Sequence, residues 1–168
     1  PAAYLHRISP RLPVEVAALV EPSAVAFNGV RRAGITPRDD VVVLGDGPIG
    51  LLVLQVARAF GARSVTVVGG TPARLAIAER TGATATVDFS STGNVLEAVR
   101  SAAGAAPSVV IEATGNPAAA GTAIATVASG GRIVFLGIFA GQKADQVDLD
   151  RIVTGDITIR GALGSPGV

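Results

Sequence analysis

The chain has 168 residues, of which 49% are hydrophobic and 16% charged, and its formal net charge is +1. This composition predicts one folded domain with a sizeable core, and it gives no support for nucleic-acid binding or a basic membrane-surface patch. Cysteine is absent and histidine occurs once, as His6. These absences exclude a disulfide framework, a zinc finger and thiol chemistry, and they leave poor ligands for zinc.

The first 33 residues predict helices. The stretch EVAALVEPSAVAFNGVRRAG indicates two helical segments separated at Glu21-Pro22, because proline disfavours the helical conformation in the residue before it. We interpret residues 1–33 as a helical connector that arrives from a preceding domain, and residues 34–168 as the domain itself.

Residues 34–168 alternate between short β-branched runs and longer alanine-rich amphipathic runs. Strands are predicted at 41–45, 64–68, 85–88, 108–112, 131–136 and 157–163, and helices at 48–60, 72–81, 93–103 and 117–128. The strands are continuously apolar, which is typical of parallel strands covered on both faces. The pattern predicts an α/β protein with a doubly wound parallel sheet in three layers.

Both ends of the sequence resemble cuts. It begins at Pro1 without a methionine or a signal peptide, and it ends on the turn residues GSPGV soon after a strand. We expect one domain of a longer polypeptide. The apolar runs are too short to span a bilayer, and the missing signal peptide favours the cytoplasm.

A glycine-rich loop follows the first predicted strand, in VVVLGDGPIG at 41–50. Gly45, Gly47 and Gly50 form GxGxxG between a strand and a helix, which is a dinucleotide-binding pattern of the Rossmann type. The first glycine permits a tight turn, the second lets the backbone approach a pyrophosphate, and the third lets helix and strand pack closely. Pro48 suits the first helical position. A Walker A loop is excluded, because no Lys-Ser/Thr follows.

The acid inside this loop, Asp46, is open to two interpretations. Asp46 is interpreted as a residue that caps or electrostatically favours the helix at 48–60; the alternative is that it touches the cofactor. Several other polar residues form no cluster and are interpreted as turn or surface residues: Asp39, Asp40, Asp88, Asn116, Asp145 and Asp148.

An expected acid is missing after the second strand. Domains that bind NAD usually place Asp or Glu there, to hydrogen-bond the adenosine ribose, but this chain has Gly69 and Gly70. Without that carboxylate nothing would repel a 2′-phosphate. Thr71 and Arg74 could donate hydrogen bonds to one. The sequence therefore predicts a preference for NADP over NAD.

Read in order, these motifs resemble a family. LVEPSAVAFNGVRRAGI, VVVLGDGPIGLLVLQVARAFGA, VVIEATGNPAA and GGRIVFLGIFAG resemble the medium-chain dehydrogenases/reductases, and in particular the zinc-dependent alcohol and polyol dehydrogenases of the sorbitol, butanediol and threonine dehydrogenase type. The resemblance implies the cofactor-binding domain of an enzyme that transfers a hydride reversibly between an alcohol and NAD(P). An N-terminal GroES-like domain would carry the zinc, so that no metal is bound within this chain.

The resemblance also implies roles for particular residues. It assigns the pyrophosphate turn to Gly45, Gly47, Pro48, Ile49 and Gly50. It places Ala113, Thr114 and Gly115 beside the cofactor, and Leu136, Gly137 and Ile138 near the nicotinamide amide. Glu21 would approach the zinc site, directly or through water; the alternative is a residue at a helix junction.

The resemblance further implies a small-molecule alcohol or ketone as substrate, and a homodimer or homotetramer formed through the edge strand at 157–163, since an apolar edge needs covering. Two other functions stay open. One is a zinc-free reductase of the same superfamily, similar to quinone oxidoreductases, and the other is a dinucleotide-binding module without catalysis.

Overall fold

In the computed structural model, six parallel strands form one sheet in the order β3-β2-β1-β4-β5-β6. The structure describes residues 7–144 and 147–164, so His6 and Asp145 lie outside the described residues. The strands are β1 (Asp40–Leu44), β2 (Ser64–Gly69), β3 (Ala85–Asp88), β4 (Val109–Glu112), β5 (Arg132–Phe135) and β6 (Thr158–Gly161). Each of the six strands was predicted within two residues of these bounds.

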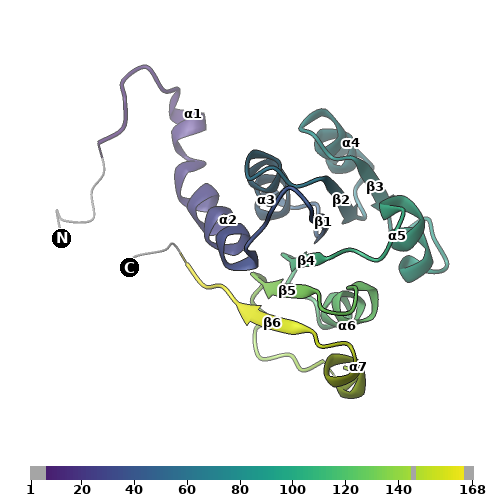
Figure 1. Cartoon of the computed structure of the whole chain (residues 1–168). Helices are drawn as coiled ribbons and strands as arrows, with labels where there is room; N and C mark the ends of the chain where they lie inside the picture. The colour runs from purple at the N-terminus through teal and green to yellow at the C-terminus, as the bar shows by residue number, and fades with distance from the viewer. Residues whose placement is uncertain (1–6, 145–146, 165–168) are drawn as a thin grey trace.

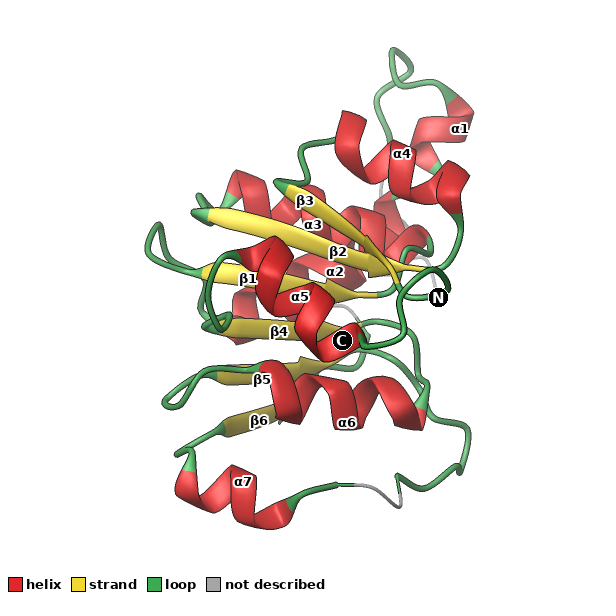
Figure 2. Cartoon of the chain, turned by 90° about the vertical axis from the view of Figure 1, so that its right-hand side faces the viewer, coloured by secondary structure: helices red, strands yellow, loops and turns green. Residues whose placement is uncertain are grey.

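Helices cover both faces of the sheet, which confirms the doubly wound α/β fold in three layers (Figure 2). They are α1 (Val14–Ala17), α2 (Val20–Ala33), α3 (Pro48–Ala59), α4 (Pro72–Arg80), α5 (Val95–Ala103), α6 (Pro117–Thr126) and α7 (Leu149–Thr154). The sequence did not predict the six-residue α7. Its first turn is capped by Asp148, whose side chain accepts the Arg151 backbone N–H at 2.9 Å.

Alternate residues of each strand enter two separate cores, one on each face. In β1, Val41 and Val43 pack with α2, α3 and α4, whereas Val42 and Leu44 pack with α5 and α6. Successive side chains of a strand point to opposite faces. A strand covered on both sides therefore needs apolar residues at every position, which is why the strands carry unbroken apolar runs.

The predicted break in the N-terminal helices is in the wrong place. Helix α1 ends at Ala17 and α2 begins at Val20, so Glu21 and Pro22 lie inside the first turn of α2. Proline is tolerated there because the first N–H groups of a helix have no intrahelical partner. Helix α2 packs against α3 and the sheet (Figure 1), and it ends at Gly34 in the left-handed conformation.

Two acids at the amino edge of the sheet are buried, although the sequence indicated turn or surface positions. Burial would raise the pKa of Asp39, but hydrogen bonds led by Ser108 outweigh it and lower that pKa below 3.8. Arg63 donates hydrogen bonds to Asp40 and lowers the pKa of that carboxyl. Arg132 pairs with Asp39 at 2.8 Å. The Asp40–Arg63 pair joins β1 to the residue before β2, and the Asp39–Arg132 pair reaches from the start of β1 past β4 to β5; both lie at the edge opposite the glycine loop.

Candidate dinucleotide site

The candidate site lies where the strand order reverses direction, between β1 and β4. Strands β2 and β3 extend the sheet on one side of this pair, and β5 and β6 on the other. In open α/β sheets, ligands bind in the crevice at the carboxyl ends of the strands beside such a switch point. The glycine loop follows β1 and residues 113–115 follow β4, so the topology brings these two predicted segments together.

The three glycines of the loop meet different constraints. Gly45 has φ +122° and faces the Thr114 side chain, and a Cβ added to Gly50 would overlap the carbonyl oxygen of Gly45. A Cβ on Gly47 would meet no atom within 4 Å. The loop therefore turns tightly at Gly45, packs helix against strand at Gly50, and leaves open space at Gly47 for a ligand to approach the backbone.

Helix α3 begins in this loop and offers free donors. Pro48 is its first residue, and its N-cap Gly47 makes no side-chain capping hydrogen bond. The N–H groups of the first turn have no intrahelical partner, and the helix dipole places partial positive charge there. The site thus presents the donors that a pyrophosphate needs. Ile49 is the second helical residue and packs partly buried against the core.

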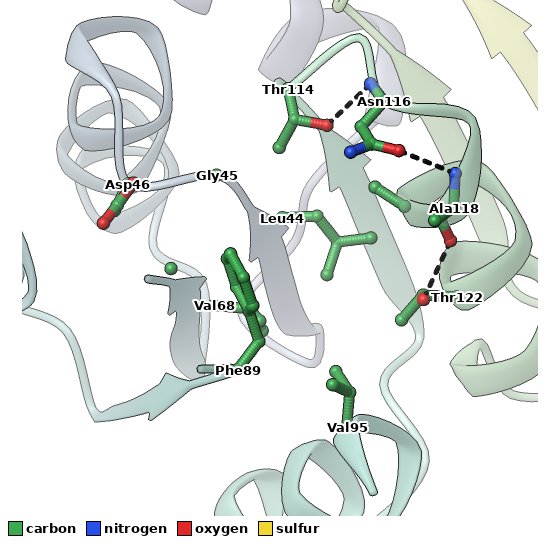
Figure 3. Close-up of a pocket in the computed structure, with 12 residues that line it drawn as sticks. Leu44, Gly45, Asp46, Val68, Phe89, Val95, Thr114, Asn116, Ala118 and Thr122 are labelled. Carbon is green, nitrogen blue, oxygen red and sulfur yellow. Dashed lines mark hydrogen bonds between the residues drawn. The ribbon is translucent and has the colours of Figure 1, made fainter. Parts of the chain in front are cut away.

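A cavity of about 390 Å³ adjoins the loop, within the usual size range of ligand pockets. Figure 3 shows Gly45 and Asp46 at one end of its lining, with Val68, Phe89 and Val95 on one side and the segment from Thr114 to Thr122 on the other. Most of its wall is apolar, as a heterocyclic base would require. The sequence did not predict Phe89, Val95 or the residues of α6 as cavity residues, because they come from elements that only the fold brings to this place.

The segment after β4 is held by a buried acid that the sequence interpretation missed. Glu112 is fully buried, and its Oε1 accepts the backbone N–H groups of Thr114 at 2.6 Å and Gly115 at 3.0 Å. The Thr114 hydroxyl also donates to Oε1. Ala113 donates its backbone N–H to the Leu44 carbonyl at 2.9 Å. An acid that ends an otherwise apolar central strand was the available sequence signal.

The segment after β5 lies against the segment after β4. A Cβ on Gly115 would come 2.5 Å from the Ile138 carbonyl oxygen, and one on Gly137 would come 2.6 Å from the Gly115 Cα. Leu136 is buried and packs against Gly29 of α2, whereas the Ile138 side chain is 73% exposed. The predicted cofactor-binding segments 113–115 and 136–138 are therefore neighbours in the structure.

Asp46 does not act on the helix that the sequence indicated. Its Oδ2 accepts the backbone N–H groups of Gly70 at 3.2 Å and Thr71 at 2.9 Å, at the start of α4 and not of α3. Only 9% of Asp46 is exposed. A carboxylate therefore does stand at the end of β2, because the side chain of Asp46 occupies the place next to Gly69.

The other residues predicted to contact a 2′-phosphate lie around this carboxylate. Thr71 is the N-cap of α4 and is exposed. Arg74 lies in the first turn of the same helix, with its side chain 53% exposed and its Nη1 4.0 Å from Asp46 Oδ1. Gly70 lies under the Phe89 ring, since a Cβ there would come 2.6 Å from Phe89 Cζ. Gly69 lines the cavity, and Gly70, Thr71 and Arg74 follow it around the Asp46 carboxylate.

Glu21 lies apart from the cofactor residues. It is exposed in the first turn of α2 and does not line the cavity. Gly29 of the same helix packs on Leu136 at the carboxyl edge of β5. Glu21 precedes Gly29 by eight positions, which at about 1.5 Å per residue places it roughly 12 Å further along the helix. That position is beyond the carboxyl edge, because α2 runs back towards the start of β1.

Across residues 7–144 and 147–164, no group of three or more His, Cys, Asp or Glu side chains could hold a metal ion. The residues in these ranges therefore do not fit a zinc site. Within the same described ranges, no helix combines the length and the apolar character needed to cross a membrane.

A Rossmann sheet with a glycine loop at its switch point defines the class of dinucleotide-binding domains. Residues 48–166 match the family model described as zinc-binding dehydrogenase. The chain is 33% identical over 162 residues to sheep (Ovis aries) sorbitol dehydrogenase, covering 95% of this chain and 45% of that protein. It is 35% identical over 160 residues to (R,R)-butanediol dehydrogenase of Bacillus subtilis, with the same coverage of 95% and 45%.

Solved structures agree with this assignment. A zinc-binding dehydrogenase from Sinorhizobium meliloti, bound to NADP, has a TM-score of 0.84 at 34% identity and covers 90% of this chain and 45% of that chain. An Escherichia coli short chain alcohol dehydrogenase, complexed with NADH, has a TM-score of 0.90 at 26% identity and covers 99% and 49%. The chain belongs to the zinc-binding dehydrogenase family. It spans about half the length of the curated relatives it matches.

Proposed function

We propose that this chain is the nicotinamide-dinucleotide-binding domain of a zinc-dependent alcohol or polyol dehydrogenase. The observation that carries the proposal is the glycine loop at the switch point, with open space at Gly47, free donors at the start of α3 and an apolar cavity beside it. The similarity to sorbitol and butanediol dehydrogenases supports a small alcohol or ketone as substrate of the whole protein.

In this function the chain binds and orients the cofactor, and the nicotinamide carries the hydride. The pyrophosphate would lie on the loop at Gly47, the adenosine in the cavity, and the nicotinamide end near residues 113–115 and 136–138. Zinc would be supplied outside this chain, where it acts as a Lewis acid on the substrate oxygen. The position of Glu21 beyond the carboxyl edge supports its predicted approach to that zinc site.

For the choice between NADP(H) and NAD(H), two groups at the end of β2 act in opposite directions. The exposed Arg74 guanidinium favours a 2′-phosphate, as the sequence predicted. The carboxylate of Asp46 opposes one through like charge. A preference for NADP(H) therefore requires Arg74 to outweigh Asp46.

The oligomeric state of the protein is also a proposal. Strand β6 forms one edge of the sheet, as predicted, and all four of its residues are exposed. Unpaired backbone groups on such an edge can pair with another strand. We propose that β6 pairs with a second copy, in a homodimer or homotetramer. The cytoplasmic location stays a prediction.

Two glycine substitutions test the dinucleotide site. Gly47→Ala adds a methyl where a Cβ meets no atom within 4 Å, so it should fold like the parent but block the pyrophosphate. We expect its affinity for NADH and NADPH, measured by fluorescence titration, to fall at least about tenfold, equivalent to about 1.4 kcal/mol. Gly50→Ala would overlap the Gly45 carbonyl and should also lower the Tm. Unchanged binding by Gly47→Ala would contradict the proposed site.

The enzymatic part of the proposal needs the full-length protein. It should oxidise a small alcohol with NAD(P), and a zinc chelator should abolish turnover. Dinucleotide binding by this chain should resist the same chelator, since no metal ligands are found among its described residues. Turnover that survives zinc removal would instead favour a zinc-free reductase.

A further inference from the structure

We propose that Asp46 supplies the carboxylate that hydrogen-bonds the adenosine ribose, in place of an acid at the end of β2, so that the site prefers NAD(H) to NADP(H). The inference rests on the proposed dinucleotide function and specifies which cofactor the site takes. It reverses the preference that Gly69 indicated from the sequence.

Asp46 fills the space at the end of β2. Gly69 is the last residue of this strand, and its backbone is not in the left-handed region. A Cβ on Gly69 would lie 2.5 Å from Cγ and 2.6 Å from Oδ2 of Asp46. The two residues therefore compete for one volume, and Asp46 fills it. Gly69 accommodates this carboxylate, and it does not leave a vacant place for a phosphate.

The Asp46 carboxylate is held through only one of its two oxygens. Its Oδ2 accepts two backbone N–H groups, from Gly70 and Thr71, which fix the side chain against the end of β2. Its Oδ1 accepts no hydrogen bond from any residue in the described part of the chain. Asp46 also lines the cavity, and Figure 3 shows it next to Gly45, on the β2 side. One oxygen is thus anchored and the other is available to ribose hydroxyls.

The charge of Asp46 disfavours a 2′-phosphate. A 2′-phosphate at this place would add about two negative charges beside an anchored, nearly buried carboxylate. Arg74 is the cation at hand, but its Nη1 stands 4.0 Å from Oδ1 and its side chain is 53% exposed. Exposed pairs of this kind are weak and are screened by salt. Arg74 would have to neutralise both the carboxylate and the phosphate, so the balance favours the two free hydroxyls of NAD(H).

The decisive variant is Asp46→Asn. The amide oxygen can still accept the Gly70 and Thr71 N–H groups, so the loop keeps its anchor while the charge and the free acceptor are removed. The matched control is Asp88→Asn, at the end of neighbouring β3, where Asp88 pairs in register with Gly69. Asp88 bonds to Ser90 and does not line the cavity. Parent and variants are titrated with NADH and NADPH at one ionic strength.

The parent should bind NADH at least about tenfold more tightly than NADPH, as expected for one charge-assisted hydrogen bond. Asp46→Asn should lower the affinity for NADH and raise or preserve that for NADPH, shifting their ratio by about tenfold or more. Asp88→Asn should leave the ratio unchanged. Thermal melts followed by circular dichroism report whether each variant is folded.

A relocation variant gives a second, independent test. Asp46→Ala should lose the preference for NADH, and the double variant Asp46→Ala/Gly69→Asp should regain it, because the emptied volume is refilled from β2. Gly69→Asp alone should lower the Tm, since both side chains then need the same space. If Asp46→Asn does not fold, the double variant tests whether a carboxylate in this volume sets the preference for NADH.

The outcomes separate the two proposals. A parent that binds NADPH as tightly as NADH, or an Asp46→Asn variant with an unchanged ratio, overturns the role of Asp46 and leaves the dinucleotide function standing. A folded parent that binds neither cofactor overturns the proposed function, and this inference with it.

Discussion

Removing the buried carboxylate of Glu112 should loosen the segment that borders the cavity. Glu112 is fully buried in β4, between Leu44 of β1 and Phe135 of β5. Its Oε1 receives three donors from Thr114 and Gly115. Its Oε2 has no hydrogen-bond partner among the described residues. Glu112→Ala deletes the acceptor on which residues 114 and 115 converge.

The size of the effect follows from these contacts. Hydrogen bonds to a charged group contribute about 1.5–3 kcal/mol each, so three contribute about 4.5 kcal/mol at the lower end. Burial of the unpartnered oxygen offsets about 1–3 kcal/mol of this sum. We expect Glu112→Ala to lower the free energy of unfolding by about 2 kcal/mol, and hence the Tm by roughly 4–8 °C in a domain of this size.

Glu112→Gln is the matched control, because its amide oxygen can still accept the same three donors. Thermal unfolding followed by circular dichroism should place this variant close to the parent, with a loss below about 1 kcal/mol. Dinucleotide titration should show weakened binding for the alanine variant and near-normal binding for the glutamine variant. A Glu112→Ala variant as stable as the parent, or an equal loss of stability in the two variants, would refute this role of Glu112.

Two further substitutions test the ion pair at the amino end of β1 and the edge strand β6. Asp40→Asn weakens the contact with Arg63 and Ser64, so the Tm should fall at pH 7 by roughly 2–4 °C. Because the folded-state pKa of Asp40 is lowered, its contribution is complete above about pH 4 and is lost as the pH falls through that folded-state value. Melting curves of parent and variant should therefore converge in acid; a constant difference would contradict this assignment. Ile159→Pro removes an N–H from β6, while the Thr158 and Ala162 N–H groups keep their hydrogen bonds to the β5 side of the sheet. Sedimentation should therefore show that the variant is a monomer where the parent is a dimer. A variant that assembles like the parent would exclude pairing through β6.

The sequence by itself determined the class of fold and the position of the glycine loop. Apolar periodicity is local, so the six strands could be predicted within two residues of their bounds. The GxGxxG pattern of Gly45, Gly47 and Gly50 is also local, because it lies within six consecutive positions. The local pattern was less informative at the N-terminus. It predicted a helix break at Glu21-Pro22, but α2 includes both residues because proline is tolerated in the first turn of a helix.

Tertiary structure alone decided how the acids are used. Strands β1 and β2 pair in parallel with Leu44 opposite Val68, and this register carries Asp46 to Gly69 and Gly70 across more than twenty positions of sequence. Likewise, pairing of β4 with both β1 and β5 buries Glu112 where it can hold the next turn. A missing acid at one position was visible in the sequence. That a carboxylate from the neighbouring loop takes its place follows only from strand register, because register sets which side chains compete for the same volume.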